Sequence, residues 1–145
     1  MLITDLIPKV RSILGDEDST NYLFTDNVYR DTKIPSGIDR FNLEFPTQFI
    51  ITGTAGTATI SPTPSADEAT LICLYSVLVS LEGEISRKAQ MAVVITDPAG
   101  RTDATKVVVE LREQRKSIRT DLNKALERAN IFGTSGESES SQDSL

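Results

Sequence analysis

The segment spanning residues 66–90 constrains the fold of this chain more than any other stretch. Ser65 and Glu68 stand at its start with the three-residue spacing of a capping box, which begins helices. Apolar side chains then recur at helical spacing, at Leu71, Leu74, Tyr75, Leu78, Leu81 and Ile85. The pattern predicts a long central helix against which the other elements pack, with Gly83 as its weak point.

The densest part of this helix, LICLYSVLVSL at 71–81, is interrupted by Ser76 and Ser80 and is shorter than the roughly 20 apolar residues of a membrane span. We therefore expect a core helix and no membrane segment. Cys73 is the single cysteine, so disulfides are excluded, and packing explains it better than catalysis or metal binding. The opening residues MLITDL lack the basic region and apolar stretch of a secretion signal, and we expect no secretion.

Two shorter helices are expected before the central one. The first starts at Asp5, where Pro8 costs one backbone hydrogen bond, or nearer Ile7, where Pro8 falls harmlessly in the first turn. Gly15 ends it. The second follows Thr25, which suits the N-cap position of a short helix.

A β region is expected at about 38–62. The segments at 48–52 and 57–61 flank the turn sequence GTAG and predict a hairpin. Before them, RFNLEF at 40–45 alternates apolar and polar residues, which predicts a strand with one apolar face formed by Phe41, Leu43 and Phe45.

A second, short hairpin is expected at about 92–105. Asp97, Pro98 and Gly100 occupy the first, second and fourth positions of a type I turn between two segments that contain valine, isoleucine and threonine.

The last element is expected to be a helix from about 104 to 132, ended by Gly133. Its apolar positions form a narrow stripe, so the helix either covers one side of the core or meets a neighbouring chain. The stripe comprises Val108, Leu111, Arg115, Ile118, Leu122, Ala125, Ala129 and Phe132.

Charge is unevenly distributed along a chain whose net charge is −6. Residues 112–128 contain six bases and three acids, and Arg112, Arg115, Lys116 and Arg119 share one side of the helix. Three interpretations of this stripe stay open: a solvated face, a contact for the acidic residues of a partner protein, and a contact for nucleic-acid phosphates. The rest of the chain is acidic, which argues against a protein dedicated to DNA binding but is compatible with DNA passing the protein without specific contacts.

The final residues, 134–145, are polar and acidic. Leu145 is their one apolar residue, and Glu137, Glu139 and Asp143 give them a charge of −3. Such a segment cannot bury enough surface to offset the entropy of ordering, so we expect a partner chain to order it. The expected organisation is therefore a single domain at 1–133, mainly helical in the α+β class with two long helices, followed by an extended tail at 134–145.

Catalytic groups are sparse. The chain has no histidine, which removes the commonest general base and zinc ligand. The cluster at 16–18 begins like a calcium loop, but Asn21 and Asn27 replace the required glycine and glutamate, so we interpret it as a solvated turn with Asp16 or Asp18 capping the next bend. GTAGTA at 53–58 lacks the lysine of a phosphate loop. We expect no enzyme, no metal and no cofactor.

The order of these elements resembles the head-to-tail adaptor (connector) proteins of tailed bacteriophages. The residues behind the likeness lie within 1–133 and are LITDLIPKVRSILGDED, TPSADEATLICLYSVLVSLEG, AVVITDPAGRTDAT and the charged terminal helix. The resemblance implies a structural ring, commonly of about twelve subunits, in the virion neck and assembled in the host cytoplasm. Such a ring docks on the portal protein, extends the DNA channel and receives the next neck or tail protein.

A closed ring requires two different complementary surfaces on each subunit. The candidates for these surfaces and for channel contacts lie at 40–45 on one side (Phe41, Leu43, Phe45) and on the terminal helix on the other (Arg112, Arg115, Lys116, Ile118, Arg119, Leu122, Phe132). Glu137, Glu139, Asp143 and Leu145 are expected to contact the portal or a neighbouring subunit. Two alternatives stay open: another neck or tail-completion ring protein, and a non-specific nucleic-acid-binding module.

Overall fold

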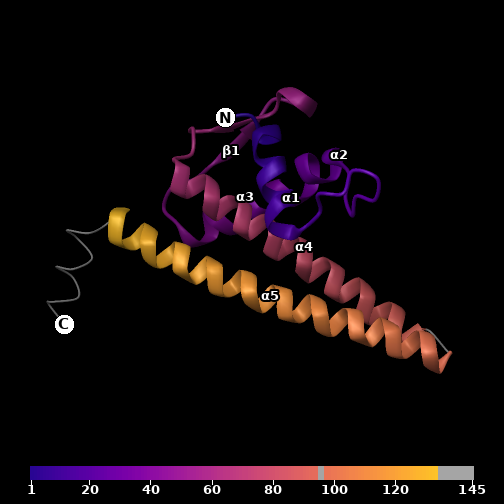
Figure 1. The fold of residues 1–145 in the computed structure, drawn as a ribbon. Coiled ribbons are helices and arrows are strands. Elements are labelled where there is room, and N and C mark those ends of the chain that lie inside the picture. Colours follow the sequence, from indigo (N-terminus) through magenta and orange to yellow (C-terminus); the bar gives the residue numbers. More distant parts are fainter. Residues whose placement is uncertain (95–96, 134–145) are drawn as a thin grey trace, which may run out of the picture.

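The computed structural model describes residues 1–94 and 97–133 of the chain (Figure 1). The fold is mainly helical with one small antiparallel sheet, which confirms the expected α+β class. In chain order its elements are η1 (Ile3–Leu6), α1 (Ile7–Leu14), α2 (Asp26–Val28), the π-helical segment η2 (Tyr29–Lys33), α3 (Ile34–Glu44), β1 (Ile50–Thr52), the 3-10 turn η3 (Ala55–Thr57), β2 (Thr59–Ser61), α4 (Ala66–Val94) and α5 (Pro98–Gly133).

Helix α4 is the central element, as its sequence pattern predicts. The capping box is formed: the Ser65 amide donates to Glu68 at 2.9 Å, and the Glu68 amide donates to the Ser65 hydroxyl at 3.2 Å. The helix runs on to Val94, four residues past the expected end. Its side chains from 71 to 78 are all buried, because α1 and α3 pack against it as well as α5.

Helices α3 and α4 approach each other closely at Gly37 of α3. A Cβ atom placed there would come within 2.8 Å of the Ser76 amide nitrogen and 2.9 Å of its Cα. The buried Ser76 hydroxyl donates to the Ile72 carbonyl at 2.7 Å, and the buried Ser80 hydroxyl donates to the Ser76 carbonyl at 2.8 Å. The two serines that interrupt the apolar run therefore satisfy their hydroxyls within α4 and leave its surface free for close packing.

The boundaries of the two N-terminal helices follow from local sequence signals. Helix α1 starts at Ile7 with Pro8 in its first turn, and Gly15, in the left-handed conformation at φ 85°, ends it. Thr25 caps α2, since its hydroxyl accepts a hydrogen bond from the Val28 amide at 3.3 Å.

The hairpin at 48–52 and 57–61 is confirmed, but the strand predicted at 40–45 is wrong. Ile51 pairs with Ile60 in the antiparallel sheet, whereas 40–44 belong to α3. Phe41 and Phe45 are four residues apart, a spacing that places them on one side of a helix, and their rings stack at 4.4 Å. A run of six residues fits both periods, and packing of Phe41 against the core selects the helix.

The hairpin predicted at 92–105 is also wrong, because α4 and α5 meet there in a helical hairpin. Asp97 is an N-cap residue rather than the first residue of a β-turn: its carboxylate accepts a hydrogen bond from the Gly100 amide at 3.2 Å. Pro98 takes the first position of α5, where its missing amide costs nothing. The terminal helix therefore begins at 98 rather than 104.

Helix α5 covers one side of its own chain's core. It runs antiparallel to α4 along its length (Figure 1). Val108, Ile118 and Leu122 of the predicted stripe are buried. Of the two alternatives for the predicted stripe, the structure therefore shows packing on the core of its own chain. The side chain of Phe132 and the tail at 134–145 lie outside the described residues.

Candidate interaction surfaces

The predicted contact residues of α5 divide into two groups. Ile118 and Leu122 are buried within the chain, so their predicted role as inter-subunit contacts is wrong for the subunit in this conformation. The other group is exposed, apart from the half-buried Arg115, and is here termed the basic flank. None of its members forms an ion pair or hydrogen bond with another described residue. The basic flank comprises Arg112, Arg115, Lys116 and Arg119.

The predicted contact residues at 40–45 divide in the same way. Phe41 is buried in the core and Phe45 is half-buried against it, so Phe41 is not available to a partner. Leu43 points away from the core and is 84% exposed. Of the three residues of the predicted apolar face, Leu43 is the one that is exposed on the surface.

Leu43 and the basic flank meet at one hollow between α3, α4 and α5. This depression of about 340 Å³ is here termed the Leu43 hollow. Its lining includes Leu43, Leu78, Arg119 and Leu126, together with Glu44 and with Arg40, which forms a 3.1 Å ion pair with Glu82. The sequence predicted two surfaces on opposite sides of the subunit, but the structure brings them together. The helical conformation of 40–44 is the reason, because it turns Leu43 toward α5.

A second surface is the far end of the α4–α5 hairpin, which extends beyond the other elements (Figure 1). We term residues 86–94 and 97–107 the arm. No described side chain of the arm is buried. Its seam contains the half-buried small residues Ala89, Ala92, Gly100 and Ala104, while Met91, Val93 and Val107 are exposed. The sequence analysis missed this surface, because it assigned residues 92–105 to a β-hairpin.

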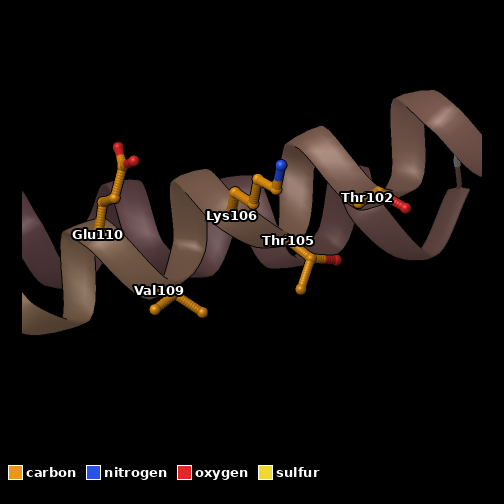
Figure 2. A pocket seen from close by; sticks show the side chains of 5 residues that line it. All are labelled: Thr102, Thr105, Lys106, Val109 and Glu110. Carbon is orange, nitrogen blue, oxygen red and sulfur yellow. The ribbon is translucent and has the colours of Figure 1, made fainter.

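A shallow depression of about 460 Å³ lies on the outer side of α5, where the arm joins the rest of the chain. Figure 2 shows its five lining residues, which all project from this one helix, with Val109 and Thr105 on one edge and Lys106 and Glu110 on the other. A site built from one helical face has no opposing wall, so it suits another protein surface better than a small molecule.

A buried polar cluster fixes the loop between α1 and α2. Arg11 forms ion pairs with Asp16 at 2.8 Å and Asp26 at 2.6 Å, and its guanidinium lies 3.6 Å from the ring centre of Tyr22. Asp16 also accepts hydrogen bonds from the Tyr29 hydroxyl at 2.7 Å and the Leu23 amide at 2.6 Å. The prediction of a solvated turn is therefore wrong for Asp16, which is 6% exposed.

The electrostatics of this cluster are those of a structural ion pair. Burial works against the charge of Arg11, but its hydrogen bond to Asp26 and the charge of Asp16 raise the pKa of Arg11 above its ordinary value. Burial, with the hydrogen bond to Asp16, raises the pKa of Tyr29 far above its ordinary value. Every charge in the cluster is paired, so it stabilises the loop and offers no free acid or base.

Neither a metal site nor a reactive thiol is found among the described residues. Within the described residues there is no group of three or more histidine, cysteine, aspartate or glutamate side chains that could hold a metal. Burial raises the pKa of the Cys73 thiol to about 11, which makes it a poor nucleophile. Residues Ala66–Val93 of α4 are long and apolar enough to cross a membrane, but 72% of their most apolar window is buried inside the protein, as in a core helix.

Comparisons with known proteins do not assign the chain to a family. No protein-family model matches it, and no curated protein or solved structure is significantly similar to it. Function must therefore be argued from the surfaces.

Proposed function

We propose that this chain is a structural subunit of a bacteriophage neck: a head-to-tail adaptor that forms a ring, docks on the portal protein and extends the DNA channel toward the tail. The observation that carries the proposal is the arm. Val93 is 81% exposed there, with Met91 and Val107 also uncovered. We interpret these exposed apolar side chains on a projecting element as a candidate contact with another chain.

The described side chains of the arm bury little apolar area within the chain, so packing on a partner would stabilise the arm. Most helix stability in proteins comes from packing of an apolar face, and two helices joined along alanines and glycine bury little apolar area. In a ring, the arm of one subunit would pack on the next subunit, so the area missing within one chain would be supplied between chains.

The charge distribution supports a head-to-tail arrangement of subunits. Residues 1–94 contain twelve acids and seven bases, a net charge of −5, whereas α5 contains eight bases and five acids, a net charge of +3. A closed ring joins two different surfaces of each subunit, and opposite charges on those surfaces favour one register and oppose self-pairing of like surfaces.

The proposal includes the portal protein above the ring, the next neck or tail protein below it, and DNA that passes through without specific contacts. A site in the virion neck and assembly in the host cytoplasm belong to the same proposal. Glu137, Glu139, Asp143 and Leu145 are predicted to contact the portal or an adjacent subunit in the assembled ring. Another neck or tail-completion ring protein is the nearest alternative, and locating the protein within the particle distinguishes the two.

Native mass spectrometry of the purified chain, alone and with its portal protein, tests the proposal. We expect a ring or a portal complex. Val93→Asp should abolish it while changing thermal stability by less than about 0.5 kcal/mol, because the side chain is exposed. Ser12→Asp, at an exposed polar position on α1 outside the arm, is the matched control and should assemble normally. A chain that remains monomeric with and without portal protein overturns the proposal.

Non-specific nucleic-acid binding is a second candidate function, favoured by the unpaired basic flank. It predicts an affinity for DNA that falls steeply with salt and is lost when Arg115, Lys116 and Arg119 are changed to glutamate. If the chain is an adaptor, the same triple variant changes the net charge of α5 from +3 to −3 and should also weaken ring formation. Loss of DNA binding with normal assembly would assign the flank to DNA, and tight salt-resistant binding would contradict a phosphate contact.

A further inference from the structure

The Leu43 hollow places apolar surface and unpaired positive charge side by side. Leu43, Leu78 and Leu126 supply the apolar lining, and Arg119 enters from α5 without a hydrogen bond or ion pair to any described residue. Arg112 and Lys116, seven and three residues earlier on the helix, continue the charge along the same side. Glu44 also lines the hollow, so a ligand suited to this surface carries one apolar side chain next to a carboxylate that lies at Arg119.

Residues 134–145 contain both kinds of side chain. Their three acids and Leu145 all occupy odd-numbered positions, so an extended backbone places them on one face. The other face carries serine and glutamine. Asp143 and Leu145 are then about 7 Å apart on the same side, which matches a carboxylate at an arginine beside a leucine in a hollow.

The segment is long enough to reach the hollow of its own chain. Helix α5 ends at Gly133, and the hollow is lined by residues between Arg119 and Leu126. At a rise of 1.5 Å per residue the hollow therefore lies about 10–21 Å back along the helix. Twelve extended residues span about 40 Å. Gly133 and Gly136 allow the chain to reverse direction.

We propose that, in the free subunit, residues 134–145 fold back along α5 of their own chain, with Leu145 in the Leu43 hollow and Asp143 paired with Arg119. Charge complementarity favours this occupant, because Asp143 is an acid and Arg119, which lines the hollow, forms no ion pair with a described residue. Attachment to the same chain favours it over a second copy, since a short connection gives an effective concentration in the millimolar range. The inference goes beyond the proposed ring and does not depend on it.

Cross-linking of the full-length chain tests the proposal. Asn123 lines the hollow and is exposed, so Asn123→Cys with Ser144→Cys should be joined within one chain by a short bismaleimide. Asp121→Cys with Ser144→Cys is the matched control, because Asp121 lies two residues away on another side of α5. We expect the first pair to react about tenfold faster. The native Cys73 is buried and common to both proteins.

Charge variants of the Asn123 pair test the predicted contact. Arg119→Glu should slow the reaction to the rate of the control pair, and adding Asp143→Lys should restore it. Lys124→Glu, which makes the same charge change on another side of α5, should have little effect. Leu145→Ser should also slow the reaction. Equal rates for the Asn123 and Asp121 pairs, or cross-links that form between chains only, would overturn the proposal.

Discussion

Gly37→Ala tests whether close contact between α3 and α4 sets the stability of the fold. The added Cβ would overlap the backbone of Ser76, at 2.8 Å from its nitrogen and 2.9 Å from its Cα, and no change of side-chain rotamer relieves a clash with backbone. Overpacking of this kind costs about 3 kcal/mol. The helix preference of alanine returns about 1 kcal/mol. We expect a net loss of about 2 kcal/mol in the free energy of unfolding and a melting temperature lower by about 8 °C.

Gly83→Ala is the matched control in α4. Its nearest neighbour would be the Lys33 ammonium at 3.9 Å, an ordinary contact at the end of a flexible side chain. The same substitution should therefore stabilise the protein by about 0.5–1 kcal/mol. Thermal unfolding followed by circular dichroism measures both variants. A neutral or stabilising Gly37→Ala would refute the close packing of α3 on α4.

The remaining predictions concern the buried polar and thiol groups. Arg11→Ala leaves the Asp16 carboxylate buried without its cation, so urea unfolding should show a loss of about 3–5 kcal/mol in the free energy of unfolding. Tyr29→Phe removes one donor to the same carboxylate and should lower the free energy of unfolding by about 1–3 kcal/mol. Equal losses for the two variants would contradict the predicted order. Because burial raises the pKa of Cys73 to about 11 from an ordinary 9.0, the unfolded thiol ionises first and stability should fall as the pH rises between those values. Cys73→Ala should lack this part of the fall, and rapid alkylation of the native thiol at pH 9 would contradict its burial.

Local sequence rules placed the elements whose signals lie within a few residues. The Ser65–Glu68 capping box, the Thr25 cap and the GTAG turn each depend on contacts between neighbours in the chain. Such contacts form in the same way in almost any tertiary setting, and for that reason the central helix, the second helix and the hairpin could be predicted.

The predictions that failed are those in which two structures share one local pattern. RFNLEF fits a strand by alternation and a helix by the four-residue spacing of Phe41 and Phe45, and Asp97–Pro98 begins a β-turn or a helix equally well. Packing of Phe41 in the core selects the helix in the first case. In the second case α4 continues to Val94 and α5 starts at Pro98, so the chain reverses between two helices rather than two strands.

The sequence by itself determined that this chain has a long apolar helix, few reactive groups and one basic stripe, since composition and periodicity suffice for those properties. Only the tertiary structure decided which apolar side chains remain exposed to solvent. Ile118 and Leu122 are buried against the chain's own core, while Leu43 and Val93 are left exposed. The reason is physical: a side chain's exposure depends on how neighbouring elements pack around it, and that packing joins residues far apart in the sequence.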